Sequence, residues 1–318
     1  MAELDLKDKK IIYELDKDSR QSLNKLAKKV RLSKDVVNYR IKKLENEDYI
    51  LGYQTLIDFT KIGYMAIRFY INLIGASPKK EKEIIDYLVK NKKVFLVSET
   101  EGYTNISLGI LVKDVYEIKE FQKDFEIKFK SFIKELKVGI YLDIFHFNRD
   151  YLLGKTSQDS KAIIINSNEK VKVDDKDIEI LKILSKNART PLIEISKKIN
   201  VNANTIAFRI KNLERKKVIL GYKIIFGYSK INYTYIKADL ILNEISREKE
   251  ILKFCEQQNN IIYVLWATGG ADIELFFEVE NTDKFLNLMK EMRERFKEII
   301  EWKYTIFSKY HKFNYFMD

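Results

Sequence analysis

Two stretches of this 318-residue chain crowd basic side chains together with carboxamide and hydroxyl groups. Residues 23–43 hold eight Lys or Arg against the single acid Asp35, and residues 192–217 hold seven against Glu194 and Glu214. Lysine and arginine at this density attract phosphates and release their counterions, and Asn and Thr side chains can bond to base edges. The chemistry within reach is therefore the recognition of duplex nucleic acid. The carboxamide and hydroxyl groups concerned belong to Asn38, Asn204, Thr205 and Asn212.

A run of like charges is most often only a solvated surface, so the position of the two runs matters. Both fall at the same place in a repeat, because residues 4–64 align without a gap onto residues 173–233 at a constant offset of 169. Roughly a third of the aligned positions are identical, and a repeat of this length is a folding module rather than a solenoid unit. What one basic stretch does, the other is expected to do as well.

Apolar spacing predicts three short helices in each copy. In the first copy, one helix starts near Asp8, a second covers residues 23–30, and a third runs from the N-cap Ser33 to about Glu47. The close joint between the second and third helices is a helix-turn-helix, whose last helix can lie in a DNA major groove. Asn202 caps the equivalent third helix of the second copy. After each third helix, residues 50–53 and 219–222 predict a short strand and wing.

The remainder of each copy predicts the element order βαββαβ of the ferredoxin-like fold. The offset there becomes 167, because the loop at 75–78 is two residues longer in the first copy. Aromatic stripes at helical spacing in both copies are interpreted as core. The predicted strands are 65–74, 95–101, 106–112 and 136–147, then 235–242, 261–267, 273–279 and a last strand from near 301, and the predicted helices include 81–90, 118–132 and 285–296.

We therefore predict an α+β chain made of two winged helix-turn-helix domains, each followed by a ferredoxin-like βαββαβ domain. The linker is polar around residues 154–160, and fully extended it would span roughly 65 Å, enough for the two halves to face each other. A short strand is expected at 162–165. The predicted domains are 1–60 and 173–229 (winged helix-turn-helix), 61–152 and 230–318 (sensing and dimerisation), and 153–172 (linker).

Composition narrows the class of protein. The chain carries 58 Lys and Arg against 47 Asp and Glu, a net charge of +11, which favours polyanionic partners, although solvated lysines are the plainer explanation. Cys255 is the single cysteine, so disulfides within the chain are excluded and a reducing compartment is expected. No signal region opens the chain and no apolar run approaches the roughly 18 residues of a membrane span. We expect a cytoplasmic protein that does not contact membranes.

Signatures of catalysis are missing from the sequence. It contains no Walker-type phosphate loop, no cluster of metal ligands and no nucleophile motif. Its two histidines, His146 and His311, are 165 residues apart, so they do not occupy equivalent places in the repeat and are interpreted as structural or surface residues. The sequence therefore predicts no catalytic residue, no metal, no cofactor and no enzymatic activity.

An ordered set of residues recurs in both copies. It consists of Leu4-Asp5, Asp8, Ile11, Ser19-Arg20, Leu26-Ala27, Leu32-Ser33, Arg40-Ile41, Leu44-Glu45, Ile50 and Gly52-Tyr53, with Asp174, Asp177, Ala188-Arg189, Arg209-Ile210, Leu213-Glu214, Ile219 and Gly221-Tyr222 in the second copy. This pattern resembles the leucine-responsive regulator/asparagine-synthesis regulator (Lrp/AsnC) family of prokaryotic transcription factors. The resemblance implies winged helix-turn-helix domains joined to ferredoxin-like, RAM-type domains whose sheets dimerise and that bind amino acids between subunits. Typical members carry one copy per chain, so we infer a covalent pseudo-dimer with its two sheets packed about an approximate two-fold axis; further self-association is left open.

A Gly-x-x-Asp turn that the family associates with effector binding maps onto residues 269–272 and, in the first copy, onto 102–105. The resemblance implies an amino-acid-like effector there. Asn105 in place of Asp removes a charge that could pair with an α-ammonium group, and a tight turn needing glycine at positive φ is the plainer interpretation. The effector residues implied are Gly102, Asn105, Thr268, Gly269 and Asp272.

The same double architecture also resembles siroheme decarboxylases, which carry histidine and arginine near the second and third strands of each sheet. Residues 98–103 and 267–271 contain neither. A regulator of transcription is therefore the predicted function, with an architectural DNA-binding protein that senses no effector, or an enzyme of the siroheme decarboxylase type, as alternatives.

The third helices, residues 33–47 and 202–216, are expected to enter successive major grooves on one face of double-stranded DNA. Because the two helices differ in sequence, the two half-sites should be unequal. Arg40 and Arg209 could instead bridge to an acid within their own modules. The predicted base-edge or near-base residues are Lys34, Asn38, Tyr39 and Lys42, and Ala203, Asn204, Thr205 and Lys211; the predicted phosphate contacts are Arg40, Lys43, Arg209 and Lys217, with Ser33 and Asn202 at the helix starts.

Overall fold

The three-helix modules form as their caps and apolar spacing predict. The computed structural model describes residues 4–154, 162–167, 169–314 and 316–317. The first helix begins earlier than predicted, because Asp5 rather than Asp8 is its N-cap. Ser33 and Asn202 cap the third helices, as expected. The helices are α1 (Leu6–Lys17), α2 (Leu23–Val30) and α3 (Lys34–Asn46) in the first copy, and α6 (Asp175–Lys186), α7 (Leu192–Ile199) and α8 (Ala203–Arg215) in the second.

The strand after each third helix does not form a wing within its own module, which corrects the prediction. Instead β1 (Ile50–Ile57) pairs antiparallel with β7 (Ile219–Phe226) of the other copy. A lone strand needs a partner for its backbone groups, and the equivalent strand of the repeat supplies one. In this two-stranded ribbon Gln54 lies opposite its own repeat equivalent, Lys223, so the approximate two-fold axis passes between them.

The strands of the two ferredoxin-like halves close into one eight-stranded barrel. The strands are β2 (Met65–Leu73), β3 (Val94–Gly102), β4 (Ile106–Val112) and β5 (Ile133–His146), then β8 (Thr234–Leu242), β9 (Ile261–Thr268), β10 (Ile273–Val279) and β11 (Ile299–Phe313). Each half has the expected element order, and the halves join edge to edge through β3–β11 and β5–β9.

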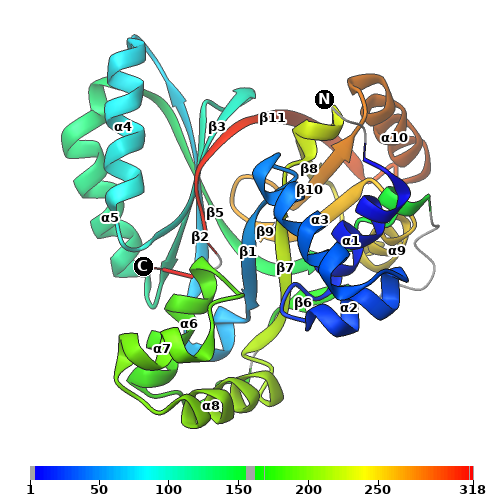
Figure 1. The fold of residues 1–318 in the computed structure, drawn as a ribbon. Coiled ribbons are helices and arrows are strands. Elements are labelled where there is room, and N and C mark those ends of the chain that lie inside the picture. The colour runs from blue at the N-terminus through cyan, green and yellow to red at the C-terminus, as the bar shows by residue number, and fades with distance from the viewer. Residues whose placement is uncertain (1–3, 155–161, 168, 315, 318) are drawn as a thin grey trace.

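Helices cover the outside of the barrel, α4 (Pro78–Lys90) and α5 (Val115–Phe129) on one side and α9 (Glu248–Glu256) and α10 (Thr282–Arg295) on the other (Figure 1). Strand residues alternate, so apolar side chains such as Phe69 and Phe277 point to the helices and form two separate cores. The α+β class and the ferredoxin-like halves are thus confirmed.

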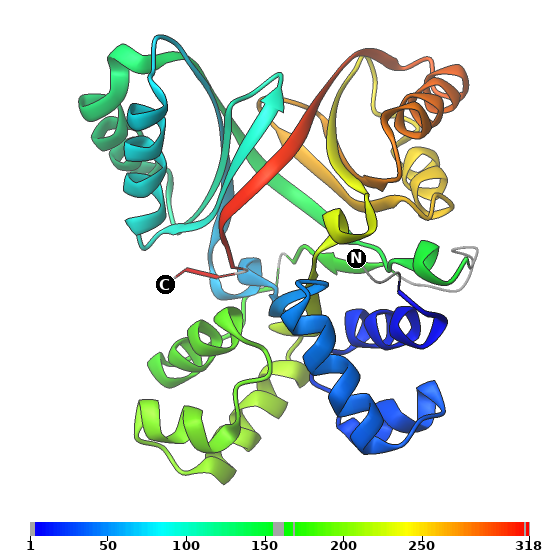
Figure 2. The same ribbon diagram turned by 45° about the horizontal axis from the view of Figure 1, so that its top comes forward.

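The two copies are crossed. Both helical modules lie at one end of the barrel, and the module of each copy sits below the sheet of the other (Figure 2). The 3-10 helices η1 (Phe59–Ile62) and η5 (Tyr228–Ile231) make the connection from ribbon to barrel, and η3 (Asp150–Leu153) follows β5. The predicted short strand in the linker is β6 (Ile163–Ile165), which pairs with β5. The most polar part of the linker, residues 155–160, lies outside the described residues.

Candidate nucleic-acid interface

Helices α3 and α8 present most of the predicted DNA-contacting side chains to solvent. On α3, Lys34 and Lys42 are exposed and Asn38 is half-buried. On α8, Asn204 and Lys211 are exposed. The predicted surface thus exists on both modules, with positive charge and amide groups on the same helix faces. The remaining predicted residues divide into Ser33, Tyr39, Asn202, Thr205 and Lys217, which are exposed, and Arg40, Lys43, Ala203 and Arg209, which are half-buried.

An exposed aromatic ring stands on each of these helices. Tyr39 is 69% exposed, and its repeat equivalent Phe208, which was not among the predicted contacts, is 71% exposed. The offset of 169 that pairs them was the signal that could have identified Phe208. Large apolar side chains are usually buried, and a ring on a groove-facing surface can contact the methyl group of thymine.

Arg40 and Arg209 brace their own modules, which confirms the alternative raised for them. Arg40 Nη1 lies 2.7 Å from carboxylate oxygens of both Asp5 and Asp8, and Arg209 Nη1 lies 2.8 Å from both Asp174 and Asp177. The bonds tie the third helix to the start of the first in each copy. A hydrogen bond from the amide of Asp177, with help from Arg209, lowers the pKa of the Asp174 carboxyl.

Contacts across the ribbon fix the two recognition helices relative to each other. The amide of Ser19 donates to Tyr222 O at 2.8 Å, and the repeat-equivalent amide of Ala188 donates to Tyr53 O at 2.9 Å. Arg189 donates to the hydroxyl of Tyr53 at 3.2 Å, and that hydroxyl donates in turn to Glu45 on α3. A side chain of one copy therefore positions the recognition helix of the other.

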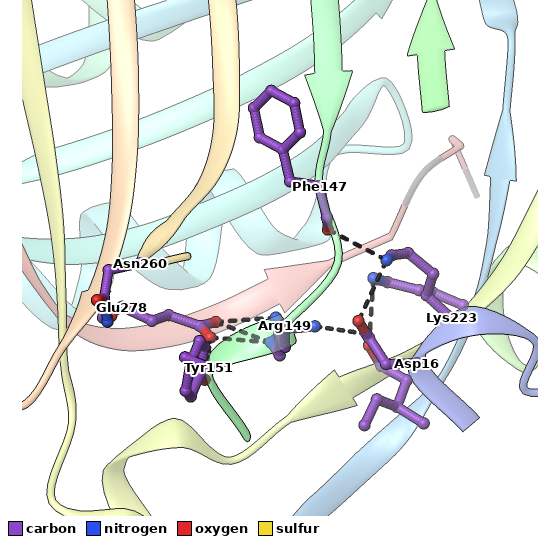
Figure 3. Close-up of polar contacts among 9 residues, drawn as sticks. Asp16, Phe147, Arg149, Tyr151, Lys223, Asn260 and Glu278 are labelled. Carbon is purple, nitrogen blue, oxygen red and sulfur yellow. Dashed lines mark hydrogen bonds and ion pairs between the residues drawn. The ribbon is translucent and has the colours of Figure 1, made fainter. Parts of the chain in front are cut away.

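A buried group of charges, here called the charged junction, connects the first module to the second sheet. It consists of Asp16 on α1, Arg149 after β5, Lys223 on β7 and Glu278 on β10. Arg149 lies between the two carboxylates, with Nη1 2.5 Å from Asp16 Oδ1 and Nη2 2.8 Å from Glu278 Oε1 (Figure 3). Lys223 Nζ approaches Asp16 Oδ2 at 3.2 Å. Two positive and two negative groups balance, as burial of charge requires.

The place that the repeat relates to the charged junction holds only uncharged side chains. Asp16 corresponds to Ser185, Lys223 to Gln54, Glu278 to Leu111 and Arg149 to Phe316. These four residues, the neutral junction, are all buried, and the Phe316 ring packs edge-on against Tyr64 with centroids 5.5 Å apart.

Inside the barrel, buried charged side chains lie among aromatic rings such as those of Tyr141, Tyr235 and Phe276. Arg68 and its repeat equivalent Lys237 are buried and face inward. Arg68 donates to Ser107 Oγ at 2.7 Å, and its Nε has no hydrogen-bond partner among the described residues. Lys237 Nζ pairs with Asp239 at 2.8 Å and lies 3.7 Å from Glu274. Arg68 borders a cavity of about 70 Å³.

The predicted effector turns have backbone roles in the structure. Asn105 Oδ1 accepts from the amide of Leu73, and Asp272 Oδ2 accepts from the amide of Leu242, both at 2.8 Å. Gly102 and Gly269 have φ of 105° and 77°, as tight turns require. Thr268 is exposed. These contacts match the plainer interpretation of the turns, and effector contact there stays a prediction.

The two histidines are dissimilar, as their spacing indicated. His146 is buried at the end of β5, with its ring edge-on to Tyr263, and burial holds its pKa well below the usual value. His311 Nε2 lies 2.8 Å from Glu99 Oε1. Within the described part of the chain, no group of three or more His, Cys, Asp or Glu is placed to hold a metal ion. No helix there is both long and apolar enough to cross a bilayer.

Both three-helix modules match a known family of DNA-binding domains. A family model for winged helix-turn-helix DNA-binding domains matches residues 4–50 and 173–219. The HTH-type transcriptional regulator LrpA of Pyrococcus horikoshii is 32% identical over 113 residues, which cover 32% of this chain and 80% of that protein. The regulatory protein AsnC of Haemophilus influenzae is 29% identical over 104 residues, covering 32% of this chain and 69% of AsnC.

Over the whole chain, the fold is similar to that of an enzyme. The crystal structure of the siroheme decarboxylase NirDL superposes on 96% of this chain and 92% of its own, with a TM-score of 0.63 and 11% identity. This finding corrects the expectation that the chain is not an enzyme, because the same two-copy architecture occurs in a decarboxylase. The lack of histidine near the two turns is therefore no ground for excluding catalysis. At this identity the likeness shows the fold alone.

Proposed function

This chain belongs to the Lrp/AsnC family of DNA-binding transcription regulators. We propose that it acts in the cytoplasm as a single-chain pseudo-dimer that binds two unequal half-sites on double-stranded DNA. The observation that carries the proposal is the pair of solvent-facing helices α3 and α8, joined through the β1–β7 ribbon across one approximate two-fold axis. In a homodimer both helices would be identical. Here they differ at most exposed positions, so each is expected to read its own sequence.

The proposed base-reading residues are those that project from the two helices. Lys34, Asn38 and Lys42 can donate to base edges from α3. From α8, Asn204 and Lys211 can do the same, with Phe208 beside them. The proposed phosphate contacts are Lys43 and Lys217. Arg40 and Arg209 are already bound to carboxylates, so they would contact phosphate only through the N–H groups that those carboxylates leave open. Ser33, Asn202, Ala203 and Thr205 sit at the helix starts, where the backbone can approach DNA closely.

Selection of bound fragments from random duplex DNA tests the proposal. We expect two dissimilar half-sites, centred about one helical turn apart. The charge reversals Lys42→Glu and Lys211→Glu, made together, should abolish selection because these two lysines are repeat equivalents on the exposed helix faces. Lys123→Glu with Lys290→Glu is the matched control, since these exposed lysines are equivalents on the outer helices α5 and α10.

The same experiment separates a regulator from an architectural protein. An architectural protein binds unrelated sequences almost equally, so a specificity ratio near one would favour it. Enrichment of one asymmetric sequence by orders of magnitude would favour the regulator.

An amino-acid-like effector is part of the proposal and rests on the family. The turn at Thr268, Gly269 and Asp272, with Gly102 and Asn105 in the other copy, is the proposed contact region. Loss of response to amino acids in Thr268→Val, with normal DNA binding, would support it.

A second candidate function is the binding and decarboxylation of a tetrapyrrole. The observation in its favour is the buried, inward-facing Arg68, whose Nε has no hydrogen-bond partner among the described residues, because a buried guanidinium can hold a carboxylate of such a substrate. Its repeat equivalent, Lys237, is already paired with Asp239. The cavity of about 70 Å³ beside Arg68 would have to widen greatly for a tetrapyrrole. Absorbance titration with siroheme tests the idea: saturable binding lost in Arg68→Gln, with release of carbon dioxide, would establish it, and no spectral change would refute it.

A further inference from the structure

A second hollow lies where the barrel meets the ribbon. Its volume is about 260 Å³, close to the roughly 300 Å³ at which small-molecule sites begin. We call it the seam pocket. Its lining combines Gln54, Ile224 and Phe226 from the ribbon with Tyr235, Tyr263 and Tyr310 from the barrel, and Arg149 and Glu278 from the charged junction. A molecule held there would touch the DNA-binding modules and the sensing sheets at once.

Gln54 supplies an acceptor that nothing satisfies. Its side chain is 2% exposed, and its Nε2 donates to Ile224 O at 3.4 Å. Its Oε1 receives no hydrogen bond from any residue that the structure describes. A buried carbonyl oxygen without a donor is unfavourable, so a ligand with an N–H group would be stabilised there.

Aromatic rings form much of the wall of the seam pocket. The Tyr235 ring centroid lies 5.3 Å from that of Tyr228 and 6.3 Å from that of Tyr310, which in turn lies 5.2 Å from Phe313. Such a wall accepts a flat apolar body, and ring faces also attract ammonium groups. The Glu278 carboxylate on the pocket wall is already paired with Arg149, so the preference for an N–H donor rests on Gln54 and on the ring faces.

We propose that the seam pocket binds a small aromatic amine, with the nitrogen donating to Gln54 Oε1 and the ring packed against the tyrosines, and that occupancy changes the affinity for DNA. The change in DNA affinity rests on the proposed function, whereas binding of the amine does not. Coupling is expected because Gln54 lies beside the approximate two-fold axis of the ribbon, and Arg149 ties the pocket wall to α1 through Asp16.

Calorimetry with three probes that share a phenyl ring on a two-carbon chain tests the site in the full chain: phenethylamine, L-phenylalanine and 3-phenylpropionate, the last of which has no N–H donor. We expect phenethylamine to bind about tenfold or more tightly than phenylpropionate, the worth of one hydrogen bond to a buried acceptor. Weaker binding of L-phenylalanine than of phenethylamine would show that the carboxylate is not accommodated. Equal binding of amine and phenylpropionate would overturn the proposal.

Two substitutions of Gln54 separate a binding role from a structural one. Gln54→Leu removes the unsatisfied oxygen and should leave thermal stability unchanged or higher, yet weaken phenethylamine binding about tenfold. Gln54→Glu keeps an acceptor and should retain binding. If Gln54→Leu binds the amine as the parent does, the assignment fails.

DNA binding is then measured with and without phenethylamine. A shift of several-fold in the parent that is absent in Gln54→Leu supports the regulatory part, and amine binding without any shift refutes that part. If the chain binds no DNA at all, the proposed function fails while the calorimetry still decides whether the pocket is a binding site.

Discussion

The charged junction and the neutral junction occupy equivalent places in a repeated fold, but one consists of charged side chains and the other of uncharged ones. On one side Asp16, Arg149, Lys223 and Glu278 form a buried ionic network. On the other side, uncharged side chains fill the same place with the same backbone pairings. The neutral junction shows that neither the barrel nor the ribbon needs charges there. Because a well-packed apolar replacement is often as stable as a buried ion pair, the network is better explained as a device for specificity or coupling than for stability.

Breaking the charged junction should have the largest effect on the molecule. Arg149→Met leaves the Asp16 and Glu278 carboxylates buried without their shared partner, so unfolding free energy should fall by about 3–5 kcal/mol. Urea denaturation measures the change.

Converting the charged junction into the neutral one tests whether the buried charges serve coupling rather than stability. The quadruple change Asp16→Ser, Arg149→Phe, Lys223→Gln and Glu278→Leu installs the residues of the neutral junction. We expect stability near that of the parent protein, with altered coupling between barrel and modules. If the quadruple variant is as unstable as Arg149→Met, the view that the charges serve coupling is wrong.

The two recognition helices offer the next comparison. Lys42→Glu alone should weaken DNA binding about tenfold or more through the half-site of the first copy, and Lys211→Glu through that of the second. Footprinting on the selected sequence would locate the loss. Protection that fades equally over both half-sites in either variant would contradict independent reading.

Burial of His146 makes a pH-dependent difference from its repeat equivalent, Phe313. The folded protein holds the His146 pKa well below 6.5, so the unfolded chain binds the proton first as pH falls. The contribution of neutral His146 is therefore present above about pH 6.5 and is lost below it, at up to about 1.4 kcal/mol per pH unit. His146→Phe should remove this component, seen as a flatter plot of unfolding free energy between pH 6.5 and 5. Parallel plots for parent and variant would show that His146 is protonated without cost.

Tyr39 and Phe208 should give the smallest effect, confined to specificity. Tyr39→Ala and Phe208→Ala each remove a ring from the proposed base-reading surface, so discrimination at one base pair per half-site should fall by about 1 kcal/mol. Repeating the fragment selection with each variant measures it. An unchanged preference in both would mean that the rings do not meet the bases.

Much of the fold was predictable because local chemistry decides it. Ser33 and Asn202 cap their helices through side-chain hydrogen bonds, and the alternation in residues 106–112 marks a strand in any context. The matching of two copies also strengthened each assignment. The predicted DNA-contacting residues could be placed on exposed faces for the same reason, since helical spacing separates inward from outward positions.

The rest depends on partners that sequence spacing does not reveal. A strand such as β1 has the same sequence pattern whether it pairs within its module or with β7, so the sequence predicted a wing and could not show that its partner strand lies in the other copy. Asp16 and Glu278 are far apart in the chain, and only the crossed arrangement brings both to Arg149. Likewise, the sequence around Gln54 predicts an ordinary polar strand residue, and only the packing of the barrel against the ribbon buries it.

Gln54 opposite Lys223 carries a consequence for how this protein sits on a chromosome. An assembly of identical subunits must place the same residue on both sides of its axis, so it can face either way along a site with equal energy. A single chain with unlike residues there is free of that constraint and has a front and a back. If the chain binds DNA as proposed, we expect it to point toward one neighbouring gene and away from the other.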